Sequence, residues 1–520
     1  MTATYDLRTQ PWIPCVRNDG AAVTLSLQAT LAEAHTLREL GGESPLVTAA
    51  LYRLLLAVLH RVYAGPADPD AWGDIWDARQ FDAVRLGAYF DRWGDRFDLF
   101  HPERPFYQAP DDRVKPKSIT ALVHHVASGN NATLFDHHTD EGGLTLIPPE
   151  AARMVVVAQT FGMGGLSGIP GVAFTGAPWV GGIIFLVQGK TLFETLVLNM
   201  LAYSENEKPP CHRTSADRPA WEQDDPFSPE RQIPHGYLDY LTWQNRRVLL
   251  FPAETANGVL VREMSVAPAL RLDAEVYDPQ KHYRSDKKLG RLALRFNEDR
   301  ALWRDSAAIF ELRGNDYHPP LTLQWLGQLQ KYTSLNKADQ QRMLALGMAN
   351  NKAKVEFYRS EQWPLPLVYL DEETGPVLVE ALKEITQTAE NVSSQLWGAM
   401  RTLAQLLLCP ESDLEGAHQP HPDDINAITR QWDVKRRYWS RLEIPFRRTL
   451  EFVPCDKDTA LADWQQTLRR AAWSAFDSIA EDLANDPRAL KAYVKAQRQL
   501  AGGLKKALPQ DNGAQEVDQP

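Results

Sequence analysis

A cluster of histidine and acidic residues near position 140 has side chains that could bind a metal ion. His137 and His138 are followed by Asp140 and Glu141, and imidazole and carboxylate groups are common ligands of catalytic metals. The spacing suits a single ion poorly, because adjacent side chains on an extended chain point to opposite faces. No second cluster of ligands accompanies them. A metal-dependent nuclease or phosphohydrolase is therefore the rival hypothesis, and we expect no metal.

A glycine-rich segment at 161–182 offers different chemistry, with eight glycines in 22 residues. A dinucleotide fingerprint that begins at Gly162 fails at Ser167, and a phosphate-binding loop that ends in the GKT sequence at 189–191 fails at Ile184. We therefore expect no nucleotide cofactor. A backbone without side chains can still approach phosphates or a groove closely. The open alternatives are a structural loop and a backbone-lined contact with nucleic acid.

The net charge of −11 argues against a protein that coats nucleic acid over its whole surface. Two local runs are nevertheless basic, at 281–295 and 430–448, although such runs are more often solvated faces than binding sites. The residues that we expect to form these basic surfaces are Lys281, Arg284, Lys287, Lys288, Arg430, Lys435, Arg436, Arg437, Arg441, Arg447 and Arg448.

Composition indicates a globular protein of two or three domains, with 520 residues and 44% hydrophobic content. The sequence contains no run of 18 apolar residues and its N-terminus has no apolar signal region, so we expect neither a membrane span nor secretion. The four cysteines lie far apart without a Cys-x-x-Cys pair, which fits a reducing cytoplasm.

Local patterns indicate a mixed N-terminal region. A hairpin is expected over 11–27, and a buried helix over 44–63 that begins with Ser44 as its N-cap. The apolar run 154–158 before the glycine-rich segment is typical of a strand. A helix is expected over 321–346, followed by a turn at Gly347 and a strand that runs to Tyr358.

From residue 376 onward the pattern becomes helical. Four long amphipathic segments are punctuated by prolines and predict an antiparallel four-helix bundle, over about 376–408, 423–443, 456–483 and 488–506. The predicted fold class is therefore α+β. It comprises an N-terminal domain of irregular sheets and helices at 1–375, the bundle at 376–506 and a polar tail at 507–520 that we expect to be frayed.

Several short motifs, taken in order, resemble one family. They are QPWIP at 10–14, LFHPERPFYQ at 99–108, GNNATLFDHH at 129–138, FGMGGLSG at 161–168 and GMANNKAK at 347–354. Together with the C-terminal bundle, they resemble the large subunit (CasA family) of Cascade, the type I-E CRISPR surveillance complex. The resemblance covers nearly the whole chain.

The resemblance implies a subunit without catalysis. It would recognise the protospacer-adjacent motif (PAM) of double-stranded DNA, mostly from the minor groove, start strand separation for R-loop formation and recruit the helicase-nuclease. The implied partners are target DNA, the guide RNA, that helicase-nuclease and the backbone, 5′-handle-binding and small subunits of Cascade. A purely structural scaffold subunit is the other alternative.

The resemblance also assigns residues. It implies PAM contacts at Gly162, Met163, Gly164 and Gly165, a wedge at Asn350, Asn351, Lys352 and Lys354, and a guide-RNA or subunit-docking loop at Asn130, Asn131, Ala132, Thr133, Leu134, Phe135 and Asp136. Two departures are visible. Lys352 stands where relatives carry a glutamine, and the region of the family's groove-inserted lysine, 265–271, has none. Arg262 or Arg271 is then the expected substitute.

Overall fold

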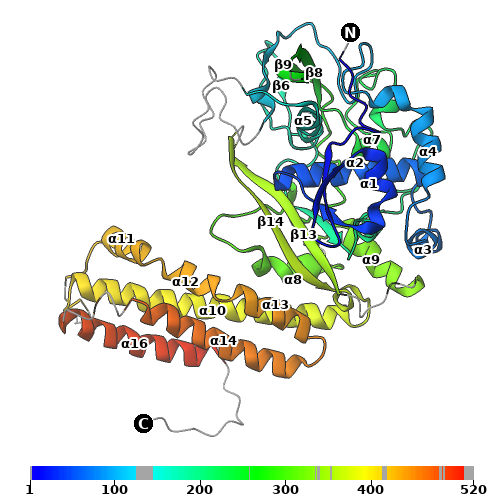
Figure 1. Ribbon diagram of the computed structural model, residues 1–520. Coiled ribbons are helices and arrows are strands. Elements are labelled where there is room, and N and C mark those ends of the chain that lie inside the picture. Colours follow the sequence, from blue (N-terminus) through cyan, green and yellow to red (C-terminus); the bar gives the residue numbers. More distant parts are fainter. Residues whose placement is uncertain are drawn as a thin grey trace. The chain divides into compact units, whose positions relative to one another are not determined.

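The chain folds into two compact units (Figure 1). The first comprises the chain up to Phe296 together with Leu312–Leu370, and the second comprises Asn297–Glu311 and the chain from Asp371 onward. The computed structural model describes residues 3–123, 144–256, 258–314, 316–333, 335, 340–351, 354–412, 418–479, 483 and 487–508.

Strands of the first unit form small antiparallel sheets, as the α+β prediction requires. The three-stranded sheets, each in its spatial order, are β2 (Ala22–Leu25), β1 (Ile13–Arg17) and β3 (Leu37–Leu40); β4 (Lys117–Ser118), β9 (Gly258–Pro268) and β8 (Arg246–Thr255); β14 (Lys354–Pro366), β13 (Gln340–Asn351) and β7 (Ile184–Gln188); and β11 (Gly290–Ala293), β10 (Tyr283–Asp286) and β12 (Tyr317–His318). A two-stranded hairpin consists of β5 (Gly165–Leu166) and β6 (Ala173–Phe174).

Helices of the first unit surround and separate these sheets. They are α1 (Leu27–Ala32), α2 (Pro45–Tyr63), α3 (Pro69–Asp77), α4 (Ala83–Arg92), α5 (Pro148–Phe161), α6 (Leu192–Leu198), α7 (Tyr237–Leu241) and α9 (Leu321–Tyr332). Short 3₁₀ turns lie at η1 (Ala34–Thr36), η2 (Gly94–Phe97), η3 (Ile119–Leu122), η4 (Ala220–Glu222) and η6 (Leu367–Leu370).

Helix α2 is the central helix of the first unit and begins as predicted. The Ser44 hydroxyl accepts a hydrogen bond from the Val47 amide, and proline occupies the first turn. The helix packs against α5 and β13. Among the described helices, α2 is the one that is long and apolar enough to cross a membrane, but 83% of its most apolar 18 residues are buried inside the protein. Its apolar surface therefore forms core.

Two predicted elements are wrong. The valine-rich run 154–158 lies inside α5, where every residue from Ala151 to Phe161 is buried, so that packing overrides the strand preference of valine. The expected helix over 321–346 is a helix followed by a strand, because α9 ends at Tyr332 and β13 begins at Gln340. Strand β13 pairs on both edges, with β14 and β7, and a central strand lacks the alternation that identifies strands in sequence.

The predicted turn at Gly347 is also wrong, because this residue lies within β13 and pairs with Arg359 of β14. Its glycine serves close packing. A Cβ atom there would lie 2.9 Å from the carbonyl oxygen of Gly182, at the end of the glycine-rich segment. The hairpin continues to the pair Asn351 and Lys354 (Figure 1). Gly347 therefore lets the hairpin lie directly against that segment.

We expect Gly347→Val to lower the free energy of unfolding by about 2–3 kcal/mol, because the obstructing atom is backbone and overpacked sites cost about this much. Chemical denaturation of the purified chain would measure the loss. Ala345→Val, two residues away on the same strand and paired with Glu361, tests whether any added bulk on β13 has the same effect. Equal destabilisation by both changes would refute a special contact at Gly347.

The second unit contains the predicted bundle, with its second helix broken into pieces (Figure 1). Its helices are η5 (Leu302–Asp305), α8 (Ser306–Phe310), α10 (Gly375–Leu408), α11 (Pro422–Trp432), α12 (Val434–Ser440), α13 (Glu443–Phe452), α14 (Lys457–Asp477) and α16 (Pro487–Ala507). The break between α11 and α12 falls at Asp433, whose φ of +49° is left-handed and ends a regular helix. The single helix expected over 423–443 is therefore two.

Residues 297–311 lie in the sequence region assigned to the N-terminal domain, yet they pack with the bundle. Arg304 donates to Glu390 of α10, and its guanidinium carbon lies 3.8 Å from the centre of the Trp439 ring. The Trp303 ring stacks on Phe446 with centroids 4.5 Å apart. These aromatic and charged contacts explain why the segment belongs to the second unit.

Candidate nucleic-acid interface

The glycine-rich segment begins where α5 ends and folds back across its own start. The Ala177 amide donates to the Gly162 carbonyl at 2.8 Å, and the Trp179 amide donates to the Thr160 carbonyl at 3.0 Å. Between these anchors the chain forms the β5–β6 hairpin. The predicted contact residues Gly162 to Gly165 therefore form the ascending side of a closed loop whose two ends are fixed together.

The tip of this loop, residues 166–173, projects from the surface. Gly168 and Gly171 have φ angles of +80° and +76°, and a Cβ atom at either would meet open space. The Ser167 hydroxyl braces the tip, because it donates to the Val172 carbonyl and accepts from the Ile169 amide at 3.0 Å. Leu166 is 97% exposed at the base of the tip. An ordered, protruding loop with an exposed apolar side chain suits insertion into a groove.

Arg246 and Asn245, at the start of β8, hold the base of the loop from beneath. The Arg246 guanidinium donates through Nη2 to the Met163 carbonyl at 2.5 Å and to the Thr175 carbonyl at 3.3 Å. Its carbon lies 5.1 Å from the centre of the Phe174 ring. The Asn245 amide donates to the Thr175 hydroxyl at 2.8 Å. Both sides of the loop are thus tied to one strand.

Lys281 was expected on a basic surface, but it is 7% exposed and supports the far end of the same segment. Its ammonium group donates to the carbonyls of Pro178 and Val180, at 2.9 and 3.0 Å. Burial lowers its pKa to about 8. The charge run in the sequence hides this role, because Lys281 precedes β10 while Arg284, Lys287 and Lys288 are exposed on the β10–β11 hairpin.

The two proposed substitutes for the groove-inserted lysine lie at different places. Both Arg262 and Arg271 are exposed. Arg262 is six residues from Pro268, the partner of Arg246 in the sheet, which corresponds to about 20 Å along the strand. Arg271 follows Leu270, whose amide donates to Gln244, beside the residues that hold the loop. The structure therefore places Arg271, and not Arg262, near the glycine-rich loop.

The β13–β14 hairpin brings part of the predicted wedge to one end. Asn350 pairs with Val355, and the last pair is Asn351 with Lys354. Lys352 lies outside the described residues, as do the expected docking loop at 130–136 and the cluster of His137, His138, Asp140 and Glu141. Elsewhere in the described chain, no group of three or more His, Cys, Asp or Glu side chains is placed to hold a metal ion. All four cysteines are described, and each is a free thiol.

The basic residues of the second unit lie on the broken helix. Arg430, Lys435, Arg436, Arg441 and Arg448 are exposed, whereas Arg437 and Arg447 are half-buried. Some of this charge is engaged within the protein. Arg447 pairs with Glu443 at 2.6 Å, Arg436 with Asp433 at 3.8 Å, and the Lys435 ammonium lies 4.3 Å from the centre of the Trp397 ring. The remaining charge is concentrated toward α13.

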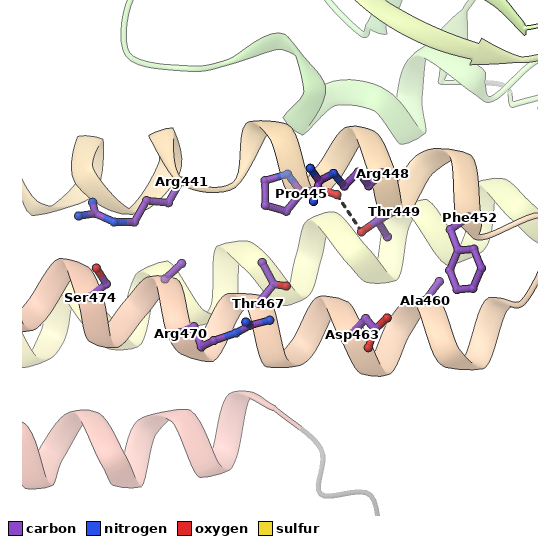
Figure 2. Close-up of a pocket in the computed structure, with 11 residues that line it drawn as sticks. Arg441, Pro445, Arg448, Thr449, Phe452, Ala460, Asp463, Thr467, Arg470 and Ser474 are labelled. Atoms are coloured by element: carbon purple, nitrogen blue, oxygen red, sulfur yellow. Dashed lines mark hydrogen bonds between the residues drawn. The ribbon is translucent and has the colours of Figure 1, made fainter.

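A groove of about 850 Å³ lies between α13 and α14 (Figure 2). Three arginines line it: Arg441, Arg448 and Arg470. The groove also carries Asp463 and the Phe452 ring, so its charge is mostly but not wholly positive. Arg470 was not among the predicted basic residues, because it lies on a different helix from the basic run that indicated this face.

An ordered backbone loop held over a buried cation, joined to a bundle with a basic face, defines a binding subunit in which the described residues contribute no assembled catalytic group. The chain belongs to the CRISPR-associated protein Cse1 family, whose model matches residues 6–475. It is 32% identical to the CRISPR-associated protein CasA/Cse1 of Thermus thermophilus over 506 residues, which are 95% of this chain and 96% of the relative.

Two solved structures have the same fold. The crystal structure of CasA from Thermus thermophilus matches with a TM-score of 0.79 and 28% identity, over 97% of this chain and 100% of that chain. One chain of a solved CRISPR RNA-guided surveillance complex matches with a TM-score of 0.75 and 22% identity, over 96% of this chain and 99% of that chain. The α+β fold class with a C-terminal bundle is thereby confirmed.

Proposed function

We propose that this chain is the subunit of an RNA-guided CRISPR surveillance complex that recognises the PAM in double-stranded DNA. The observation that carries the proposal is the glycine-rich loop, which is closed at its base, projects at its tip and is held over a buried guanidinium. Membership of the Cse1 family supports placing it in such a complex, and a surveillance-complex chain shares its fold. Proposed partners are guide RNA, other Cascade subunits and a helicase-nuclease, in the cytoplasm.

The chemistry of the loop suits tolerant reading of a short motif. The minor groove presents a degenerate pattern of acceptors with one guanine amine, so few contacts can distinguish its sequences. Backbone amides at Gly164 and Gly165 and one long side chain, Arg271, match that requirement. In RNA-guided recognition the protein reads the motif and base pairing reads the remaining sequence. The acidic net charge is compatible with this role, because the contact is local.

The adjacent hairpin is the proposed wedge. Its strands reach Asn351 and Lys354, and Gly347 sets it against the end of the glycine-rich segment. Binding at the loop and opening at the hairpin would therefore occur on one connected surface of the first unit. Prying one base step apart costs a few kcal/mol, which a rigid hairpin with pairing on both edges of β13 can transmit.

We expect the double change Asn351→Ala with Lys352→Ala to slow R-loop formation about tenfold on closed duplex. We expect nearly unchanged binding to a duplex that is already open beside the motif, because one unstacked step accounts for a few kcal/mol. Stopped-flow fluorescence of a base analogue beside the motif would measure both rates. An equal loss on both substrates would contradict a wedge.

A metal-dependent nuclease stays the rival, since its candidate ligands lie outside the described residues. Incubating the assembled complex with target duplex and Mg²⁺ or Mn²⁺, without a helicase-nuclease, tests it directly. We expect no cleavage. Cleavage that His138→Ala with Asp140→Ala abolishes would favour the enzyme over the proposed non-catalytic subunit.

A further inference from the structure

We propose that Arg246 is the positioning residue of the glycine-rich loop and that it supplies a positive subsite for a DNA phosphate at the loop's base. This inference rests on the proposed function and adds to it a residue with a defined role. Arg246 lies 83 residues along the chain from Met163, whose carbonyl it holds, and the sequence gives no sign of the contact.

The positioning role follows from geometry. One guanidinium nitrogen bridges the carbonyls of Met163 and Thr175, which lie on opposite sides of the β5–β6 hairpin. Gly162 is required for this arrangement, because a Cβ atom there would overlap the guanidinium group. The planar group also faces the Phe174 ring. Loop and guanidinium are therefore fitted to each other, so that any movement of Arg246 moves both sides of the hairpin.

The electrostatic role follows from the lack of a counter-charge. Arg246 is 5% exposed, and within the described part of the chain it forms no ion pair. Its Nη1 atom is buried without a hydrogen-bond partner among those residues. Burial lowers its pKa to about 10, so that it is still charged at neutral pH. A buried cation is costly when unpaired. A phosphate at the adjacent loop backbone would supply the missing anion and gain from the low local dielectric.

Neighbouring Arg247 provides a matched control. It follows Arg246 on the same strand, so its side chain leaves the opposite face. Its guanidinium lies over the Phe227 ring and 3.8 Å from an Asp111 carboxylate oxygen. Removing either arginine deletes one positive charge from β8, but only Arg246 contacts the glycine-rich loop.

The test compares wild type, Arg246→Gln, Arg246→Lys and Arg247→Gln in the complex assembled with guide RNA. Affinity is measured over a range of salt concentrations for a duplex with the PAM, a duplex without it, and a pre-opened duplex. We expect Arg246→Gln to weaken binding to the PAM duplex roughly tenfold, and to reduce the slope of log affinity against log salt by about 0.9 if one phosphate contact is lost. Arg246→Lys should keep the slope but lose part of the discrimination. Arg247→Gln should match wild type.

The outcomes separate the two proposals. A wild-type complex that ignores the PAM overturns both. A discriminating wild type together with an equally discriminating Arg246→Gln overturns the role of Arg246 alone. Loss of binding to the pre-opened duplex as well would show that Arg246→Gln only destabilises the chain, and it would also overturn the role.

Discussion

Gly164→Asp is expected to reduce PAM-dependent binding of the assembled complex about 100-fold, because placing like charge against a phosphate costs several kcal/mol. The substitution is compatible with the fold. Gly164 does not have a positive φ, and a Cβ atom there would lie 3.3 Å from the Phe174 carbonyl oxygen, a tight but tolerable contact. Competition binding with PAM-bearing and PAM-lacking duplexes measures the effect.

Gly164→Ala is the matched control, because it adds the same Cβ atom without charge. We expect a change of less than about threefold, since one tight contact of this kind costs well under the several kcal/mol of like-charge repulsion. Both variants should unfold at nearly the wild-type denaturant concentration. A Gly164→Asp complex that discriminates PAM sequences as wild type does would remove the glycine-rich loop from the recognition surface.

Trp303→Ala is expected to lower the free energy of unfolding of the second unit by about 3–5 kcal/mol, the usual cost of deleting a large buried aromatic side chain. Trp303 is 2% exposed, stacks on Phe446 and meets the Trp464 ring edge-on with centroids 6.0 Å apart. Denaturant unfolding followed by tryptophan fluorescence and far-UV circular dichroism would measure the change.

The control for this prediction is Trp473→Ala, which removes a tryptophan from the same unit. Trp473 is only half-buried on α14 and meets Phe476 at its edge, 6.1 Å between centroids. We expect a cost of about 1 kcal/mol, typical of a partly buried position. If Trp303→Ala were no more costly than Trp473→Ala, residues 297–311 would not be an integral part of the bundle.

Much of the architecture was predictable because local signals and packing agree. The N-cap at Ser44 and the following proline mark α2 at its actual start, and the prolines between long amphipathic segments mark the bundle. Predictions failed where packing overrides local preference. The valines of α5 are buried on all sides of a helix, and β13 is a central strand whose residues also favour helices.

The candidate site was predictable only in part, and for a physical reason. Glycine density identified the loop, because close approach requires residues without side chains. The groups that hold the loop, Arg246 and Lys281, come from distant positions in the chain and are buried, so neither charge nor spacing identifies their role. The prediction for Lys281 was wrong because a buried lysine next to exposed ones has the same sequence pattern as a basic surface.

The most direct test of the central claim is the affinity of the surveillance complex, assembled with and without this chain, for matched duplexes that differ only in the PAM. We expect the complete complex to prefer PAM-bearing duplex at least tenfold, a difference of about 1.4 kcal/mol, and the complex without this chain to bind both duplexes equally. Equal discrimination by the two assemblies would contradict the account and assign PAM recognition to another subunit.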